Sequence, residues 1–176
     1  MVIPKESEFL EGDIVFRRGV GLSSEAVLYV DSGQYSHVGI VANYQGKKMI
    51  IHAVPGEKEF EGDIDRIKMD SIQKFYSHDK AVAGAICRPY DLGIGKKAAN
   101  RAMELYGKHI PFDHDYDSSD TTKLYCTELL MYIYQKEGKE LVDGDGHVFN
   151  VPFINHKVYT PSDIFKSKQV KIIRTF

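Results

Sequence analysis

The chain has 176 residues, of which 43% are hydrophobic and 27% charged, the composition of an ordinary globular domain that can bury a substantial core. Its net charge of −2 provides no electrostatic footprint for nucleic acid or for an anionic membrane surface. No apolar run approaches the ~20 residues of a membrane-spanning helix, so we expect no integral membrane segment. We predict a single domain over residues 1–176.

Alternating or continuous apolar runs bounded by turn residues predict six strands. They lie at residues 14–16, 36–44, 47–54, 62–68, 81–89 and 169–176. Helical periodicity and capping residues predict five helices between or after these strands. They lie at residues 25–31, 69–78, 93–107, 124–134 and 159–167. Because the strands come early and short connections link them, we predict an α+β fold with a mainly antiparallel sheet.

Two of these helices have capping signals that can be named. Ser23 or Ser24 is expected to cap the first helix, and Gly33 to stop it. Asp70 or Ser71 is expected to cap the short second helix.

The two cysteines lie in different settings and are too few for a disulfide framework. Cys87 belongs to an apolar strand and is most simply a buried residue. Cys126 falls in the first turn of the helix that Gly138 ends, where free N–H groups and the helix dipole favour a thiolate. The segment alone leaves two interpretations of Cys126 open, a small buried hydrophobic residue or a reactive thiol.

Two histidines are expected to meet on the hairpin formed by residues 36–54. If Gln45-Gly46 is a two-residue loop, Gly39 lies opposite His52, and His37 lies on the same face one pair away. Gly39 then leaves room for the two rings. Such a pair suits a relay in which His37 takes a proton from a thiol and His52 orients the ring of His37.

Four segments together resemble the permuted papain-like amidases of the YiiX/YaeF type. They are LEGDIVFRRG, YSHVGIVANY with KKMIIHAV, GKHIPFDHDYD with LYCTELLMYIYQKEG, and VYTPSDIFKS, spread over residues 10–168. The resemblance extends to the NlpC-type cell-wall peptidases and to the lecithin:retinol acyltransferases. It implies a circularly permuted papain-like fold in which the histidine strand precedes the nucleophile helix.

The resemblance also assigns roles to individual residues. Cys126 corresponds to the nucleophile, His37 to the general base and His52 to the orienting residue, where many relatives have a glutamate. It implies a cysteine peptidase or amidase that cleaves an amide bond in a peptide, a cell-wall fragment or an N-acyl compound, through a thioester and without a cofactor. The backbone N–H of Cys126 would supply one oxyanion donor.

Three aromatic residues are expected to contact the substrate. Phe112 lies in the loop 109–117, which borders the cleft in the relatives, and Tyr125 precedes the nucleophile. Tyr35 is placed on the strand face of His37, although packing against the core is an equally good interpretation of this residue.

A metal site is the first of three alternatives that the sequence leaves open. Calcium is disfavoured at residues 113–124, because Ser118 and Leu124 replace the Gly and Glu of a calcium loop. We therefore interpret residues 113–117 and 143–147 as solvated loops and predict no metal site, although Cys126 and the two histidines are also a zinc-type ligand set. The second is a binding domain that has lost its chemistry, and the third is an acyltransferase or thioesterase acting on lipid acyl groups.

The first twelve residues, MVIPKESEFLEG, lack the long apolar core of a signal peptide. We expect a cytoplasmic protein if the chain is as synthesised, and an exported one if it is a trimmed mature form. The residues predict no oligomeric state.

Overall fold

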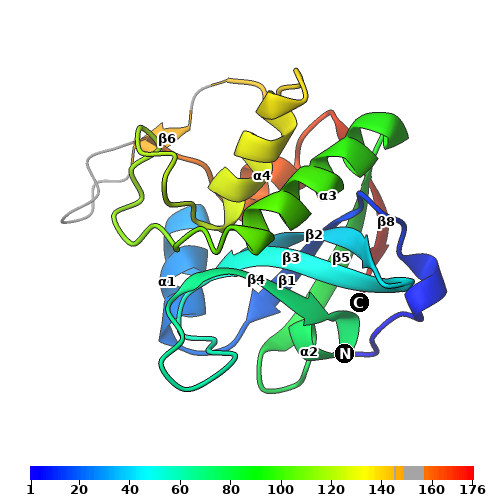
Figure 1. Cartoon of the computed structure of the whole chain (residues 1–176), viewed down its shortest axis with the longest axis horizontal. Helices are drawn as coiled ribbons and strands as arrows, with labels where there is room; N and C mark the ends of the chain where they lie inside the picture. Colours follow the sequence, from blue (N-terminus) through cyan, green and yellow to red (C-terminus); the bar gives the residue numbers. More distant parts are fainter. Residues whose placement is uncertain (145, 149–156) are drawn as a thin grey trace.

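The computed structural model of the chain describes residues 1–144, 146–148 and 157–176. Its centre is an antiparallel sheet with strand order β4-β3-β2-β1-β5-β8 (Figure 1). The strands of this sheet are β1 (Ile14–Gly19), β2 (His37–Tyr44), β3 (Lys47–Val54), β4 (Arg66–Ser71), β5 (Ala81–Pro89) and β8 (Val170–Thr175). A separate small pair consists of β6 (His147–Val148) and β7 (Lys157–Val158).

Helices cover both faces of the sheet. They are the short helix η1 (Glu6–Glu8), α1 (Leu22–Asp31), α2 (Ile72–Phe75), α3 (Leu92–Gly107), α4 (Cys126–Lys136) and α5 (Pro161–Phe165). Figure 1 shows α3 and α4 on one side of the sheet and α2 on the other. The predicted α+β class and the antiparallel sheet packed against the helix of Cys126 are confirmed.

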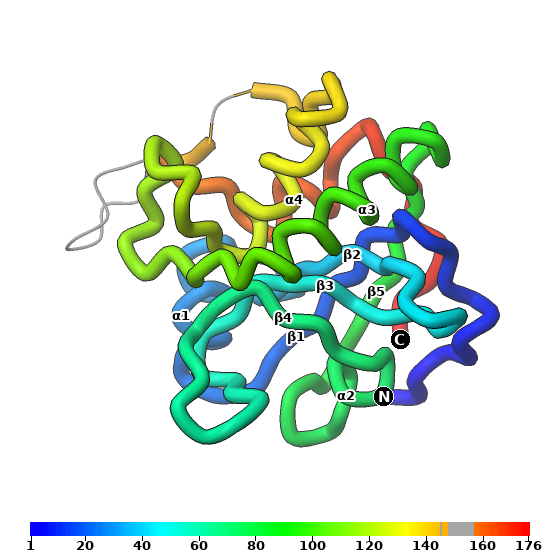
Figure 2. Tube along the Cα trace, viewed as in Figure 1, coloured from blue at the N-terminus to red at the C-terminus, as the bar shows by residue number. Residues whose placement is uncertain are grey.

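The two faces of the sheet bury separate apolar clusters. Side chains such as Phe16, Ile40 and Ile51 pack with α3 and α4, whereas their strand neighbours Val15 and Ile50 pack with α2. Coverage on both faces explains why the central strands are nearly continuous apolar runs. Both ends of the chain add to the second cluster, and Figure 2 shows them on the same side of the molecule.

The structure corrects two predicted caps. Helix α1 begins at Leu22 after Gly21, which has φ 87°, so neither Ser23 nor Ser24 caps it. It ends at Asp31, and its C-cap is Ser32 with φ 52° and not Gly33. For α2, Ser71 is the cap, with its Oγ accepting the N–H of Lys74 at 3.2 Å, whereas Asp70 belongs to a strand.

The strand predicted at residues 62–68 is shifted to 66–71. Asp63 holds the preceding residues in a turn, because its carboxylate accepts the backbone N–H of Glu59 and pairs with Arg66 and Lys68. Strand β4 then pairs with β3 from Arg66 onward. The shift matters for function, because it places Asp70 in the sheet beside the histidine hairpin.

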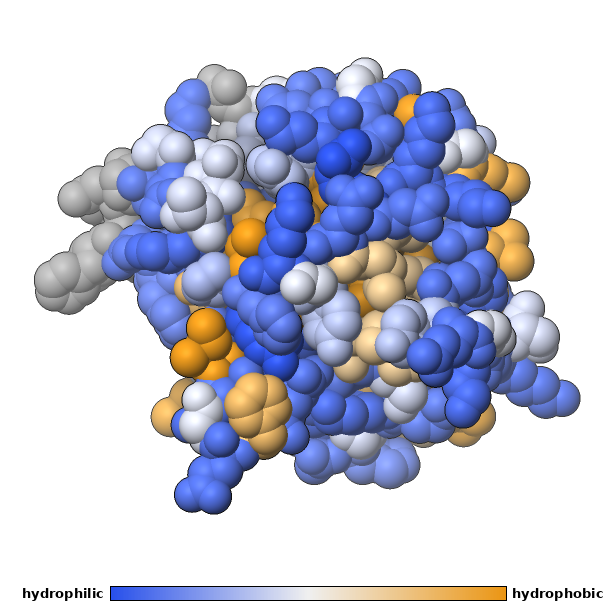
Figure 3. Space-filling view, in the orientation of Figure 1, coloured by the Kyte–Doolittle hydropathy of each residue, from blue (hydrophilic) through white to orange (hydrophobic). Residues whose placement is uncertain are grey.

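Within residues 1–144, 146–148 and 157–176, no helix combines the length and the apolar character needed to cross a membrane. Figure 3 shows a face that is mostly hydrophilic. That the whole chain is one domain stays a prediction.

Candidate active site

The histidine hairpin has the register predicted from Gln45-Gly46. Tyr44 pairs with Lys47 and Val41 with Ile50, so β2 and β3 are joined by a two-residue turn in which both residues have positive φ. Gly39 lies against His52, since a Cβ placed on Gly39 would be 3.1 Å from the Cβ of His52. The missing side chain at Gly39 therefore makes the space in which the rings meet.

His37 and His52 form a buried hydrogen-bonded pair. His37 Nε2 lies 2.8 Å from His52 Nδ1, and the ring planes are inclined at 76°. Phe75 of α2 packs against both rings, with centroid distances of 5.8 Å and 5.1 Å. With His37 at 7% exposure and His52 at 0%, only His37 has an edge that can reach the surface of the site.

Cys126 is the first residue of α4, and so lies in the first turn, where the sequence predicts it. The preceding Tyr125 is its cap, and Glu128 Oε2 accepts the Tyr125 N–H at 3.2 Å. Backbone N–H groups of Val38, Thr127 and Cys126 itself surround the thiol, and each lowers its pKa. Val38 is the neighbour of His37 in β2, so the N-terminus of α4 meets the sheet where the histidine strand begins.

The surroundings of the thiol and of the imidazole favour the neutral form of each group. Burial raises the pKa of Cys126 to about 11 despite the three N–H groups. Burial, followed by the charges of Arg17, His52 and Lys80, holds the pKa of His37 well below its usual value. A preformed thiolate–imidazolium pair is therefore not what this environment favours, and the proton would have to move to His37 as the sulfur attacks.

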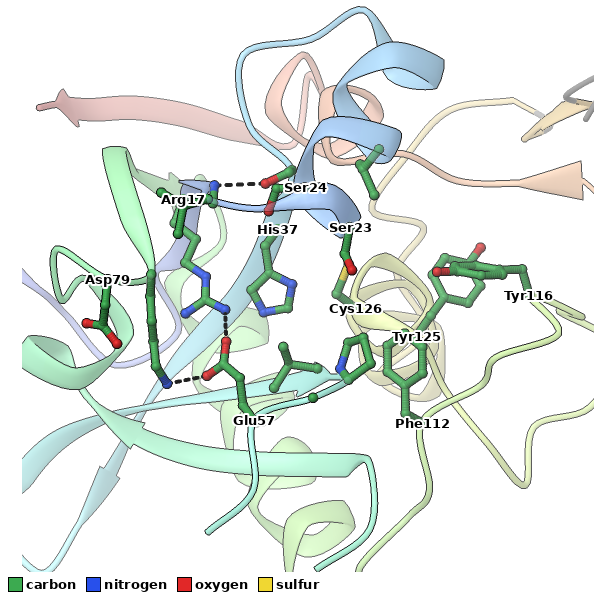
Figure 4. Close-up of a pocket in the computed structure, with 18 residues that line it drawn as sticks. Arg17, Ser23, Ser24, His37, Glu57, Asp79, Phe112, Tyr116, Tyr125 and Cys126 are labelled. Atoms are coloured by element: carbon green, nitrogen blue, oxygen red, sulfur yellow. Dashed lines mark hydrogen bonds and ion pairs between the residues drawn. The ribbon is translucent and has the colours of Figure 1, made fainter.

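Cys126 and His37 line one cavity of about 310 Å³ (Figure 4). Figure 4 shows the His37 ring between Arg17 and the Cys126 side chain. The cavity wall is polar on the side of Arg17, Glu57 and Lys80.

Cys126 also borders a second, apolar cavity of about 290 Å³. Its apolar lining includes Val27, Val30, Val158, Tyr116 and Tyr125.

Arg17 is a residue of this site that the sequence did not reveal. It pairs with His37 across β1 and β2, and its guanidinium lies 4.7 Å from the centre of the Phe75 ring. It donates to the Phe75 carbonyl at 3.0 Å and pairs with Glu57, which also pairs with Lys80. The one available signal was a charged residue, Arg17, ending the apolar run of the first strand.

The structure places the three predicted aromatic residues differently. Phe112 and Tyr125 line the cavity of Cys126 and His37. Tyr35 does not, because its ring packs between Phe16 and Phe165 in the core. The prediction that Tyr35 shares the face of His37 is wrong, since β2 begins only at His37 and the alternation of a strand does not extend to Tyr35.

A zinc site made of Cys126, His37 and His52 does not fit the geometry. His37 Nε2 and His52 Nδ1 are bonded to each other, and His52 Nε2 lies 3.4 Å from Asp70 Oδ2. These contacts leave one of the four ring nitrogens, His37 Nδ1, for a bond to a metal. Among the described residues, the one group of metal-type ligands is His52, Glu57 and Asp70. Both carboxylates of this group are already paired with cations.

Of the two loops interpreted as solvated, the one at residues 113–117 is only partly exposed to solvent. Asp113 is 1% exposed. Its carboxylate accepts the backbone N–H groups of Asp115 at 2.9 Å and Asp117 at 2.7 Å, so both of its oxygens are bonded within the same loop. Asp115 is exposed, as expected. Asp145 lies outside the described residues.

No family model matches the sequence, and no curated protein matches it. Among solved structures, the chain is similar to one described as the metalloprotein YiiX from Escherichia coli O157:H7. The TM-score is 0.75 at 18% identity, and the match covers 94% of this chain and 97% of that one. The chain has a YiiX-like fold.

The YiiX-like fold confirms the architecture that the four sequence segments predict. At 18% identity the likeness concerns the fold and carries no activity with it. The chemistry of the site therefore depends on the side chains of this chain.

Asp70 is the second residue of the site that the sequence did not reveal. It is 1% exposed, and it contacts His52 from the side opposite to His37. The missed signal was the register of β4, in which Asp70 pairs with Ile50 and Lys68 with His52.

Proposed function

We propose that this protein is a thiol hydrolase that cleaves an amide bond in a peptide, a cell-wall fragment or an N-acyl compound. The observation that supports it is that a cysteine at a helix N-terminus and a buried histidine pair line one cavity. Cys126 is the nucleophile, His37 the general base and His52 the residue that orients His37.

The reaction begins with a neutral pair. Cys126 Sγ attacks the carbonyl carbon while its proton passes to His37 Nδ1, and a C–S bond forms. The C–N bond then breaks, and the leaving amine takes the proton from His37. Water attacks the resulting thioester as His37 accepts one of its protons, which returns to the sulfur as the acid leaves. The N–H groups at the start of α4 are available to stabilise the oxyanion.

The two cavities suit the two halves of such a substrate. Cys126 borders both of them, so a scissile bond at its sulfur would have one part on each side. The apolar cavity also supports a second candidate function, transfer or hydrolysis of lipid acyl groups. A series of p-nitrophenyl esters of increasing chain length separates the two candidates. Rates that rise steadily with acyl length favour the lipid acyl function, and rates highest for short acyl groups favour the amidase.

Acylation by p-nitrophenyl acetate tests the nucleophile directly. We expect a burst of p-nitrophenol and one acetyl group on Cys126, found by peptide mass spectrometry. Cys126→Ala should abolish the burst, and His37→Ala should slow it by about 10²-fold or more, the usual contribution of a general base. Cys87 is the internal control, because burial raises its pKa to about 12. Equal, slow labelling of Cys87 and Cys126 would contradict a hydrolase and favour a binding domain.

A further inference from the structure

The carboxylate of Asp70 is an anion enclosed in the sheet. It lies on β4 with an exposure of 1%, and one oxygen is 3.4 Å from His52 Nε2. The same oxygen is 3.6 Å from the Lys80 ammonium, and the other oxygen is 2.6 Å from the Lys74 ammonium. Burial alone would raise the pKa of Asp70, but its contacts with His52 and Lys74 outweigh burial and lower the pKa. Asp70 is therefore a carboxylate that can only accept hydrogen bonds.

This acceptor determines where His52 carries its proton. A neutral imidazole has one N–H and one bare nitrogen. The 3.4 Å contact of Nε2 with the Asp70 carboxylate is an ion-pair contact and not a hydrogen bond, so the preference is electrostatic. An N–H beside the anion is favoured, whereas a bare Nε2 would place two buried acceptors side by side, which is costly. His52 therefore holds its proton on Nε2, and its Nδ1 is an acceptor.

The same logic extends to His37. Because His52 Nδ1 is an acceptor, the hydrogen bond of 2.8 Å requires that His37 Nε2 carry the proton. His37 Nδ1 is then bare. It is the remaining ring nitrogen, and it is the one that can take a proton from the cavity that Cys126 lines.

We propose that Asp70 is a positioning residue that sets the tautomers of His52 and His37 in series, so that His37 presents a bare Nδ1 to Cys126. The consequence for catalysis rests on the proposed function, whereas the tautomers themselves do not. In place of a triad, the chain thus has a line of four residues, which are Cys126, His37, His52 and Asp70.

The charges around the line are consistent with this arrangement. Arg17 on β1 and Lys80 before β5 face His37, and their charges oppose its protonation. Lys74 on α2 and Lys80 offset the charge of Asp70, and Glu57 after β3 offsets that of Arg17 and Lys80. With both histidines neutral, the relay works through hydrogen-bond direction and needs no buried imidazolium at rest.

The tautomers can be measured without any substrate. In protein labelled with ¹⁵N-histidine, two-bond ¹H–¹⁵N correlation spectra at pH 7.5 distinguish protonated from bare ring nitrogens. We expect Nε2–H with bare Nδ1 for both His37 and His52. A proton on His52 Nδ1 in the wild-type protein would overturn the proposal, and this result needs no variant to fold.

Asp70→Asn tests the cause. The amide can donate to His52 Nε2, which would move the His52 proton to Nδ1 and the His37 proton to Nδ1 as well. We expect both tautomers to reverse and alkylation of Cys126 by iodoacetamide at pH 7.5 to fall by about 10²-fold. The equivalent change in a serine protease triad, one step closer to the nucleophile, costs about 10⁴ because it leaves the wrong tautomer.

Asp13→Asn is the matched control. Asp13 is also 1% exposed, but its carboxylate accepts two hydrogen bonds of 2.8 Å from Arg88, whereas that of Asp70 contacts His52. It should lower stability and leave the tautomers and the alkylation rate unchanged. If Asp70→Asn leaves the tautomers unchanged while His37→Ala abolishes alkylation, the role of Asp70 is wrong and the hydrolase stands. If the tautomers reverse but alkylation never depended on His37, the hydrolase is wrong and the role of Asp70 stands.

Discussion

Gly39 is the residue on which the histidine pair depends. A side chain there would place its Cβ 2.8 Å from Ile50 Cγ2, 3.0 Å from the Ile51 carbonyl oxygen and 3.1 Å from the Cβ of His52. Two of these neighbours belong to rigid parts of β3, so they cannot move aside without disturbing the strand. Even a methyl group therefore has to displace the strand that carries His52.

Gly39→Ala is predicted to weaken both the fold and the site. Overpacking of this kind costs about 1–3 kcal/mol of unfolding free energy, and the displaced His52 should also slow alkylation of Cys126. Urea unfolding and iodoacetamide labelling measure the two effects. Gly107→Ala is the control, because a Cβ at the end of α3 meets nothing within 4 Å. If Gly39→Ala behaves like Gly107→Ala, Gly39 does not make the space for the rings.

At the scale of elements, the hairpin is the most predictable part of the site. A two-residue loop fixes the pairing of every residue in β2 and β3, so the meeting of His37 and His52 follows from Gln45-Gly46. Apolar spacing and Gly138 also place Cys126 in the first turn of its helix, although the helix begins at Cys126 and not at residue 124.

The rest of the site depends on elements whose bounds the sequence does not give. A polar pair before a helical segment is a common capping signal, so the sequence favours a helix cap at Asp70 or Ser71. Only the pairing of β4 with β3, set by the turn around Asp63, places Asp70 beside His52. Glu57 and Lys80 come from two different loops, and only their ion pair in the structure shows that they lie on the same side of the cavity of Cys126 and His37.

The N-terminus of α4 carries a second buried carboxyl group with a testable titration. Glu128 closes the capping box with Tyr125, and burial raises its pKa to about 8, with a further contribution from nearby aspartates. The folded protein therefore holds this proton over a pH range in which the unfolded chain has lost it. As pH rises from about 4.5 to 8, this group should lower the free energy of unfolding.

Glu128→Gln removes that titration and keeps a side chain that can close the box. Between pH 5 and pH 8, the unfolding free energy of the variant should fall less than that of the wild type, by about 1 kcal/mol or more, since each pKa unit corresponds to 1.36 kcal/mol. Urea unfolding at several pH values measures this difference. Parallel curves for the two proteins would show that Glu128 is ionised in the fold.

For the whole molecule, covering the sheet on both faces lowers the free energy of unfolding at acidic pH. Both histidines of the pair are buried on the α2 face, and burial lowers the pKa of each below 6.5. Below pH 6.5 the two histidines are protonated in the unfolded chain while they remain neutral in the folded protein. Stability should therefore fall as pH drops through 6.5, which is opposite in sign to the effect of Glu128.

Comparing variants isolates this contribution from the others. Each unit by which a histidine pKa is lowered removes about 1.4 kcal/mol once pH is below both values. His52→Gln should be less stable than the wild type at pH 7.5, yet lose less stability on acidification to pH 5. His109→Gln is the control, because it removes an exposed histidine and leaves the buried pair intact. If His52→Gln and the wild type lose equal stability between pH 7.5 and pH 5, folding does not lower the pKa of His52, and burial of the pair does not oppose its protonation.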